Sequence, residues 1–190
     1  MRDERFVCPI CDGAASVSAK MSRVAPPKKN GYRIVAIDNA TERAGVSVFD
    51  NGELVFFTLL RFEGDTIGRM LKNRSVLEDV IFKVWEPDLV VFEDIQYQTN
   101  VQTFKTLAML LGNSLVSARK VGIKTETVLS KVWRSHFLIS GKTRLEQKKQ
   151  AIQKVKTMYG LDVNDDQAEA ILIGKYAVDK VNRPAPKKLF

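Results

Sequence analysis

The chain has 190 residues, of which 45% are hydrophobic and 27% are charged, a composition typical of a soluble globular protein. Its formal net charge of +8 favours a polyanionic partner, nucleic acid before a membrane surface. No apolar run approaches the length of a membrane span, and no hydrophobic signal segment follows Met1. We therefore expect no membrane partner and a cytoplasmic location, in a cell or in an infected host cell.

Residues 1–30 have the composition of an appendage that ends in a linker rich in proline and lysine. Cys8 and Cys11, the two cysteines of the chain, form a C-x-x-C pair, which is half of a four-ligand zinc site. Three interpretations stay open: two reduced thiols without metal, a Zn²⁺ site completed by the same pair of a second chain, and a redox pair. With only two cysteines, the chain has no disulfide framework.

Residues 32–57 predict a three-stranded meander. An apolar run in this stretch stops at Asp38, a second run follows, and Asp50-Asn51-Gly52 between the second and third strands is a hairpin signal. A buried carboxylate without a partner is costly, so Asp38 at the end of a central strand indicates a nearby cation. The alternative is that Asp38 simply begins a turn.

Residues 66–85 show an interrupted helical stripe that Pro87 closes. The short apolar run at residues 88–92 is typical of a strand buried on both faces and reached through a helical crossover. It ends at Glu93, so a second apolar strand also stops at an acid.

Residues 99–121 predict another helix, and residues 124–129 predict a fifth strand. The helix has an apolar side, which either packs on the protein's own sheet or forms a subunit interface. If it forms the interface of a homodimer, we expect the contact to centre on Leu107, Leu111 and Leu115.

Residues 130–139 are amphipathic, and residues 143–159 predict a strongly basic helix. A last helix is predicted to run to about residue 181, followed by a loose basic tail at residues 182–190. Asp166 and Glu169 open the last helix and share one face of it. Acids in a first helical turn also suit the helix dipole, which is the ordinary explanation for them. That explanation does not account for Asp38 and Glu93.

We expect an α/β domain over residues 31–181 with a five-stranded mixed sheet of order 3-2-1-4-5, flanked by helices. In that order the first and fourth strands are neighbours, so their terminal acids and the start of the last helix meet at one point. Four converging carboxylates repel one another unless cations hold them. A pair of Mg²⁺ ions about 4 Å apart is the known use of such a cluster on phosphodiesters.

From about residue 32 to residue 178 the chain resembles the RuvC-type Holliday-junction resolvases of the ribonuclease H-like superfamily. The resemblance rests on Ile37-Asp38 with a later Gly45, on Phe92-Glu93, and on the acid-x-x-acid of the last helix. It implies a homodimeric Mg²⁺-dependent endonuclease with Mn²⁺ as a substitute ion, from a bacterium or a phage, that resolves four-way junctions and other branched DNA. The implied metal ligands are Asp38, Glu93, Asp166 and Glu169, with Asp165 as the alternative to Asp166.

The resemblance also implies that Lys148 lies near the scissile phosphate, with Lys131 or Arg134 as a second cation. We expect further DNA contacts from the basic segment and from one aromatic residue: Lys142, Arg144, Lys149 and Tyr97. The position of the family's aromatic wedge is occupied by Gln96, next to Tyr97. Competing functions are an exonuclease or RNA-cleaving nuclease on the same fold, and a non-catalytic module that binds branched DNA.

Overall fold

The computed structural model describes residues 31–96 and 100–182. Cys8, Cys11 and Tyr97 lie outside the described residues, so their expected parts in zinc and DNA binding stay predictions. The division into an appendage of residues 1–30, a domain of residues 31–181 and a tail of residues 182–190 is likewise a prediction.

The described part of the chain folds around one five-stranded mixed sheet, whose order β3-β2-β1-β4-β5 confirms the order expected from the sequence. The central strand β1 pairs antiparallel with β2 and parallel with β4, and β4 pairs parallel with β5. The strands are β1 (Arg33–Asn39), β2 (Arg43–Asp50), β3 (Glu53–Arg61), β4 (Leu89–Asp94) and β5 (Lys124–Leu129).

The turn between β2 and β3 has the backbone that the sequence predicts for a tight hairpin. Asn51 and Gly52 adopt φ values of 50° and 87°. Two successive positive φ angles give the turn a twist that matches the twist of its strands, and Asn-Gly is the favoured pair for them. The side chain of Asn51 accepts a hydrogen bond of 3.2 Å from the backbone N–H of Tyr32, which ties the turn to the start of the meander.

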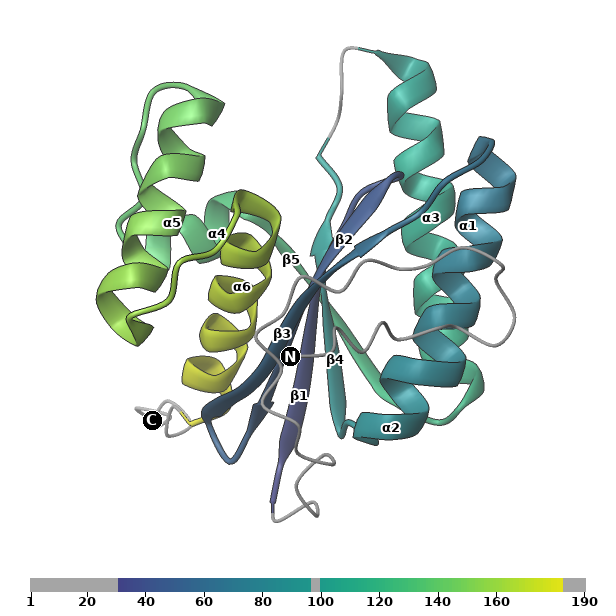
Figure 1. The fold of residues 1–190 in the computed structure, drawn as a ribbon, viewed down its shortest axis with the longest axis horizontal. Helices are drawn as coiled ribbons and strands as arrows, with labels where there is room; N and C mark the ends of the chain where they lie inside the picture. The colour runs from purple at the N-terminus through teal and green to yellow at the C-terminus, as the bar shows by residue number, and fades with distance from the viewer. Residues whose placement is uncertain (1–30, 97–99, 183–190) are drawn as a thin grey trace, which may run out of the picture.

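Helices cover both faces of the sheet, which gives three layers (Figure 1). One face carries α1 (Thr66–Ser75), the π-helical segment η1 (Val76–Phe82), α2 (Lys83–Trp85) and α3 (Val101–Lys120). The other carries α4 (Ser130–His136), α5 (Arg144–Tyr159) and α6 (Asp165–Val181). None of the helices in the described residues is long and apolar enough to cross a membrane.

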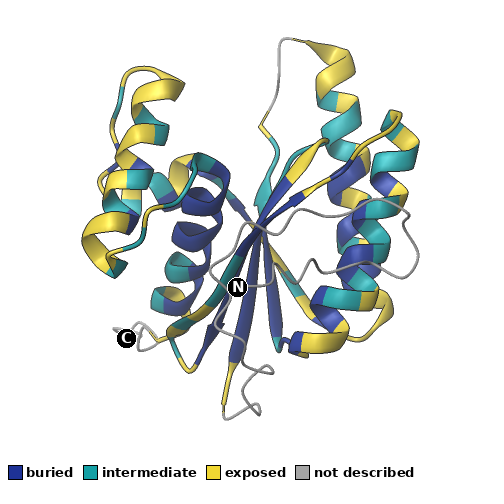
Figure 2. Cartoon of the chain, viewed as in Figure 1, coloured by how far each residue is buried: buried dark blue, intermediate teal, exposed yellow. Residues whose placement is uncertain are grey.

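The side chains on the two faces of the sheet belong to two separate hydrophobic cores. Side chains of a strand alternate between its faces, so Val35 and Ile37 join the core under α1, η1 and α3, whereas Ile34 and Ala36 join the core under α4, α5 and α6. This arrangement leaves β1 and β4 buried on both sides (Figure 2). It explains why their sequences are continuous apolar runs.

The helix predicted for residues 66–85 forms as one helical run with a π segment in its middle. The change of hydrogen-bond pattern in η1 accounts for the interrupted 3.6-residue stripe. The run ends at Glu86, which adopts a left-handed backbone with φ 44°, directly before Pro87.

The apolar side of α3 packs on the protein's own core. Leu111 is 8% exposed, and Leu115 is partly buried against the same core cluster, which includes side chains of the sheet and of η1. Leu107 is half-buried. Leu111 is therefore covered within one chain, whereas the expected part of Leu107 and Leu115 in a subunit interface stays a prediction.

Candidate active site

Two of the predicted acids stand side by side at the carboxyl ends of neighbouring parallel strands. Ile37 of β1 is in register with Phe92 of β4, so Asp38 and Glu93 follow at equivalent positions. Because Ile37 and Phe92 point into the core under α1 and α3, alternation directs the two acids to the opposite face. That face is the one covered by α4, α5 and α6. Both acids are half-buried.

The other two acids come from the first turns of α6. A capping box begins this helix. The side chain of Asn164 accepts a hydrogen bond from the backbone N–H of Gln167, and the side chain of Gln167 accepts one from the backbone N–H of Asn164. Asp166 and Glu169 are therefore not needed as caps. They are 7% and 2% exposed, which is unusual for carboxylates and requires a specific environment.

Gly45 allows α6 to reach the strand that bears Asp38. Gly45 is the β2 partner of Asp38, and a Cβ added to it would lie 2.1 Å from the backbone oxygen of Asp166. No side chain fits there, so glycine is required by close approach and not by a turn. Two residues further along β2, the hydroxyl of Ser47 donates to the backbone oxygen of Ala170 at 2.8 Å. These contacts fix the first turns of α6 over the end of β1.

The four carboxylates influence one another strongly enough to be treated as one cluster. Burial, together with the negative charges of Glu93, Glu169 and Asp166, holds the pKa of Asp38 well above its ordinary value, and the ammonium of Lys148 only partly opposes this shift. A carboxylate surrounded by three others is a strong attractor for a cation. The ammonium of Lys148 is thus close enough to act on Asp38, whereas the binding of a metal cation there stays a prediction.

Glu93 and Asp166 show the same effect. Burial and then the charge of Glu169 raise the pKa of Glu93, against a hydrogen bond from Trp133 that lowers it. Burial and then the charge of Asp165 raise the pKa of Asp166. Raised pKa values on several neighbouring acids are typical of functional sites.

Lys148 distinguishes Asp165 from Asp166. Its ammonium donates to the carboxylate of Asp165. Burial alone would raise the pKa of Asp165, but the bond to Lys148 and its charge outweigh burial and lower it. Asp166 instead stays among the acids, and its Oδ2 has no hydrogen-bond partner in the described part of the chain. The geometry therefore favours Asp166 as a member of the cluster.

Three residues that contact the acids were not predicted in these roles. The Nε of Arg43 lies 3.0 Å from Oδ2 of Asp166, a charge contact without an aligned hydrogen bond. The indole N–H of Trp133 donates to Oε1 of Glu93 at 2.9 Å, and the Nη2 of Arg134 donates to Oε1 of Glu169 at 2.6 Å. The sequence analysis could not find the Trp133 and Arg43 contacts, because nothing in the local pattern reveals a distant partner.

The expected DNA-binding residues divide into two groups. Lys131 and Arg134 line a cavity of about 480 Å³ together with Gln96 and the start of α4. Arg134 was expected to contact DNA, but in this structure its guanidinium is paired with Glu169. The others are exposed and belong to the segment that begins α5: Lys142, Arg144 and Lys149.

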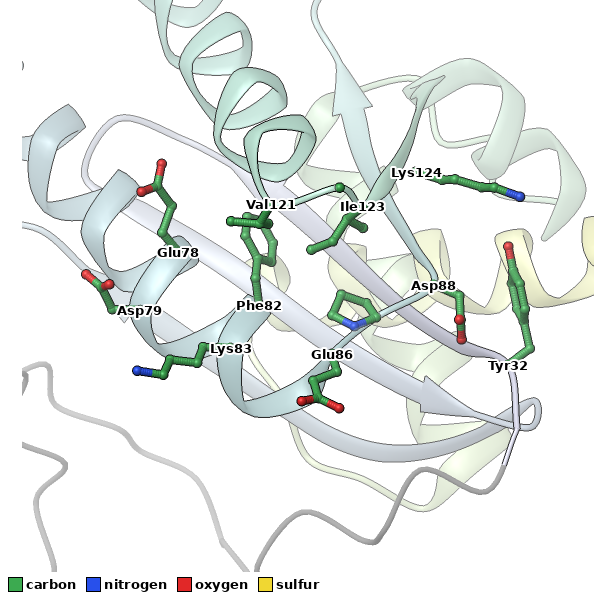
Figure 3. Close-up of a pocket in the computed structure, with 12 residues that line it drawn as sticks. Tyr32, Glu78, Asp79, Phe82, Lys83, Glu86, Asp88, Val121, Ile123 and Lys124 are labelled. Atoms are coloured by element: carbon green, nitrogen blue, oxygen red, sulfur yellow. The ribbon is translucent and has the colours of Figure 1, made fainter.

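A larger cavity, of about 720 Å³, lies at the other end of the sheet (Figure 3). Tyr32, Asp88 and Lys124, which precede or begin β1, β4 and β5, line it with Phe82 and other residues of the helical layer. The acids stand at the opposite ends of β1 and β4. The larger cavity and the carboxylate cluster are therefore separate features of the molecule.

The residues present suit a divalent cation. Among the described residues, no three His, Cys, Asp or Glu side chains are arranged as a ready-made metal site. Two of the four carboxylates are instead in contact with Arg43 and Arg134. Carboxylate oxygens are nevertheless the ligands that Mg²⁺ prefers. The buried Oδ2 of Asp166 without a hydrogen bond is such an oxygen.

The sheet order and the two helical layers define a ribonuclease H-like α/β fold, as predicted. The structure is similar to that of RuvC from Thermus thermophilus, both in complex with a Holliday junction substrate (TM-score 0.65, 14% identity, covering 80% of this chain and 96% of that one) and in a second structure (TM-score 0.62, 16% identity, 78% and 95%). It is also similar to the yeast mitochondrial Holliday junction resolvase Ydc2 (TM-score 0.55, 16% identity, 85% and 84%).

No protein-family model matches the sequence, and a sequence comparison with curated proteins gives no match. The likeness to the solved structures, at identities of 14–16%, establishes the RuvC-type fold that the sequence motifs predicted.

Proposed function

We propose that the chain is a metal-dependent endonuclease that cuts branched DNA, with four-way junctions as its main substrate, by paired hydrolysis of phosphodiesters. The observation that carries this proposal is the convergence of four carboxylates at one end of the sheet, where burial and mutual repulsion raise the pKa of Asp38. The RuvC-type fold supports it, since one similar structure is a complex with a Holliday junction substrate.

In this proposal Asp38, Glu93, Asp166 and Glu169 hold Mg²⁺, or Mn²⁺ in its place. Bound ions of this kind activate the attacking water and neutralise charge on the leaving oxygen. The protein's own contribution is to keep the four carboxylates close together in a largely water-free setting, where electrostatic interactions are stronger. Lys148, held beside the cluster by Asp165, supplies a fixed positive charge for the scissile phosphate.

DNA binding would depend on the basic segment beside the acids. Lys131 and Arg134 belong to the wall of the cavity of about 480 Å³, and the exposed Lys142, Arg144 and Lys149 continue the positive charge toward α5. Cations that neutralise phosphates supply most of the affinity for DNA irrespective of sequence. The formal net charge of +8 agrees with such a role.

We further propose that two chains form a homodimer, because paired cuts placed symmetrically about a junction need two matching sites. The interface we now favour is the outer face of α3. Val101, Met109 and Val116 are 56%, 55% and 61% exposed, and their spacing puts them on one side of the helix with Gly112. A Cβ at Gly112 would meet nothing within 4 Å, so a second chain could approach closely there.

The test is a panel of synthetic substrates incubated with the full-length protein and Mg²⁺. We expect symmetric nicks in a four-way junction and little cleavage of linear duplex or of an RNA–DNA hybrid. Cleavage of the hybrid alone would assign the chain to the RNA-cleaving alternative. Tight junction binding without cleavage under any divalent ion would make it a non-catalytic binding module.

A further inference from the structure

The two arginines that contact the acids are unusual partners for a structural ion pair. The side chain of Glu169 is 3% exposed and that of Arg134 is 15% exposed, so their pair is largely removed from water. A buried ion pair is favourable only if its remaining hydrogen-bonding groups are also satisfied. Arg134 does not meet this condition, because its buried Nε has no hydrogen-bond partner within the described residues.

The second contact is incomplete in the same way. Arg43 and Asp166 approach to 3.0 Å, yet Oδ2 of Asp166 is buried and lacks a hydrogen bond from any described residue. The arginine side chain is 44% exposed. Such a contact supplies positive charge but little of the directional bonding that makes arginine–carboxylate pairs strong.

Apart from the acids, the two arginines are surrounded by a cavity, an aromatic ring and solvent. Arg134 lines the cavity of about 480 Å³ beside Lys131. Its other neighbour is the ring of Trp133, over which its Cζ lies 4.8 Å from the centroid. Arg43 extends from β2 at the surface of the protein. Each arginine thus borders a cavity or solvent as well as an acid.

We propose that Arg134 and Arg43 are tethered counter-cations that neutralise Glu169 and Asp166 in the metal-free protein and that a divalent cation must displace. The inference rests on the proposed function, since it takes the two acids as metal ligands. It assigns both arginines a regulatory part at the site. They stabilise the acids before metal arrives, and they weaken metal binding by competing for the same oxygens.

The sign of the effect separates this role from a structural one. Loss of an arginine that merely supports the fold would leave metal affinity unchanged or lower it. Loss of a competing cation removes positive charge beside the site and frees a carboxylate, so it raises metal affinity.

The experiment measures Mn²⁺ binding to full-length protein without DNA, with free Mn²⁺ followed by electron paramagnetic resonance. We expect Arg134→Gln and Arg43→Gln each to bind Mn²⁺ roughly threefold or more tightly than the parent protein. The matched control is Arg119→Gln, which removes the same charge from an exposed position in the last turn of α3 and should leave the affinity unchanged.

Thermal unfolding provides a second measurement in case Arg134→Gln folds poorly. Without metal we expect this variant to melt below the parent protein, because Glu169 is left buried and unpaired, and we expect Mn²⁺ to restore more stability to it than to the parent. Arg43 is partly exposed, so Arg43→Gln tests the same reasoning with less risk to the fold.

The outcomes distinguish this inference from the proposed function. Equal or weaker Mn²⁺ binding by both variants would overturn it even if junctions are cleaved, and an increase in only one variant would overturn the assignment of the other arginine. The expected order of affinities without cleavage of any branched substrate would leave the inference standing and reject the nuclease. Absence of Mn²⁺ binding by every protein would reject both.

Discussion

Gly45→Ala tests whether close contact between β2 and α6 builds the carboxylate cluster. The new Cβ would lie 2.1 Å from the backbone oxygen and 2.7 Å from the carbonyl carbon of Asp166, and real contacts of this kind are not shorter than 3.0 Å. The start of α6 must therefore retreat by about 1 Å. Overpacking of this kind costs about 1–3 kcal/mol. A misplacement of about 1 Å at a catalytic site can reduce the rate by roughly 100-fold.

We expect Gly45→Ala to remain folded, with a Tm lower by about 5 °C, and to lose roughly 100-fold in junction cleavage. Circular dichroism and single-turnover nicking assays measure the two effects. The control is Gly68→Ala in α1, where the new Cβ would meet nothing closer than 3.4 Å. Cleavage by Gly45→Ala within threefold of the parent protein, at an unchanged Tm, would refute the claim that this contact places Asp166.

Asp38→Asn should abolish cleavage yet stabilise the metal-free protein at neutral pH, because burial and the neighbouring acids raise the pKa of Asp38. A carboxyl with a raised pKa loses its contribution to stability as the pH rises from its ordinary pKa to its raised pKa. Chemical denaturation of the parent protein across this pH range should show the loss, and Asp38→Asn should lack it. The control Asp165→Asn should cleave with a milder defect. Trp133→Phe removes the hydrogen bond that lowers the pKa of Glu93, so the acidic limb of the pH–rate profile should move to higher pH, and an unmoved limb would count against this contact. Val116→Lys should convert a dimer to a monomer in light scattering without changing the Tm, whereas a dimer that persists would exclude the outer face of α3.

The sequence was sufficient for the sheet and for the approximate place of the acids. Alternation, apolar runs and turn signals depend on residues close together in the chain, so they predicted the five strands and the hairpin at Asn51. The strand order then required Asp38 and Glu93 to be neighbours, since parallel strands end at the same edge.

The partners of the acids came only from the tertiary structure. Trp133 contacts Glu93 across 40 residues of sequence, and Arg134 contacts Glu169 across 35, distances over which no local pattern carries information. The same reason explains why the sequence left two interpretations of the apolar side of α3 open. Periodicity shows that a helix has an apolar side, but Leu111 is covered by its own core, and only the packing of the layers reveals that.

The choice between Asp165 and Asp166 depends on both the sequence and the tertiary packing. The sequence placed two adjacent acids at the start of a helix, and adjacent residues on a helix point in different directions. Which direction faces the cluster depends on how α6 is rotated against the sheet. Gly45 sets that contact by admitting the backbone of Asp166, and Lys148 holds Asp165 on the other side. The residue types were thus fixed by the sequence, whereas their roles were decided by the packing of α6 on β2.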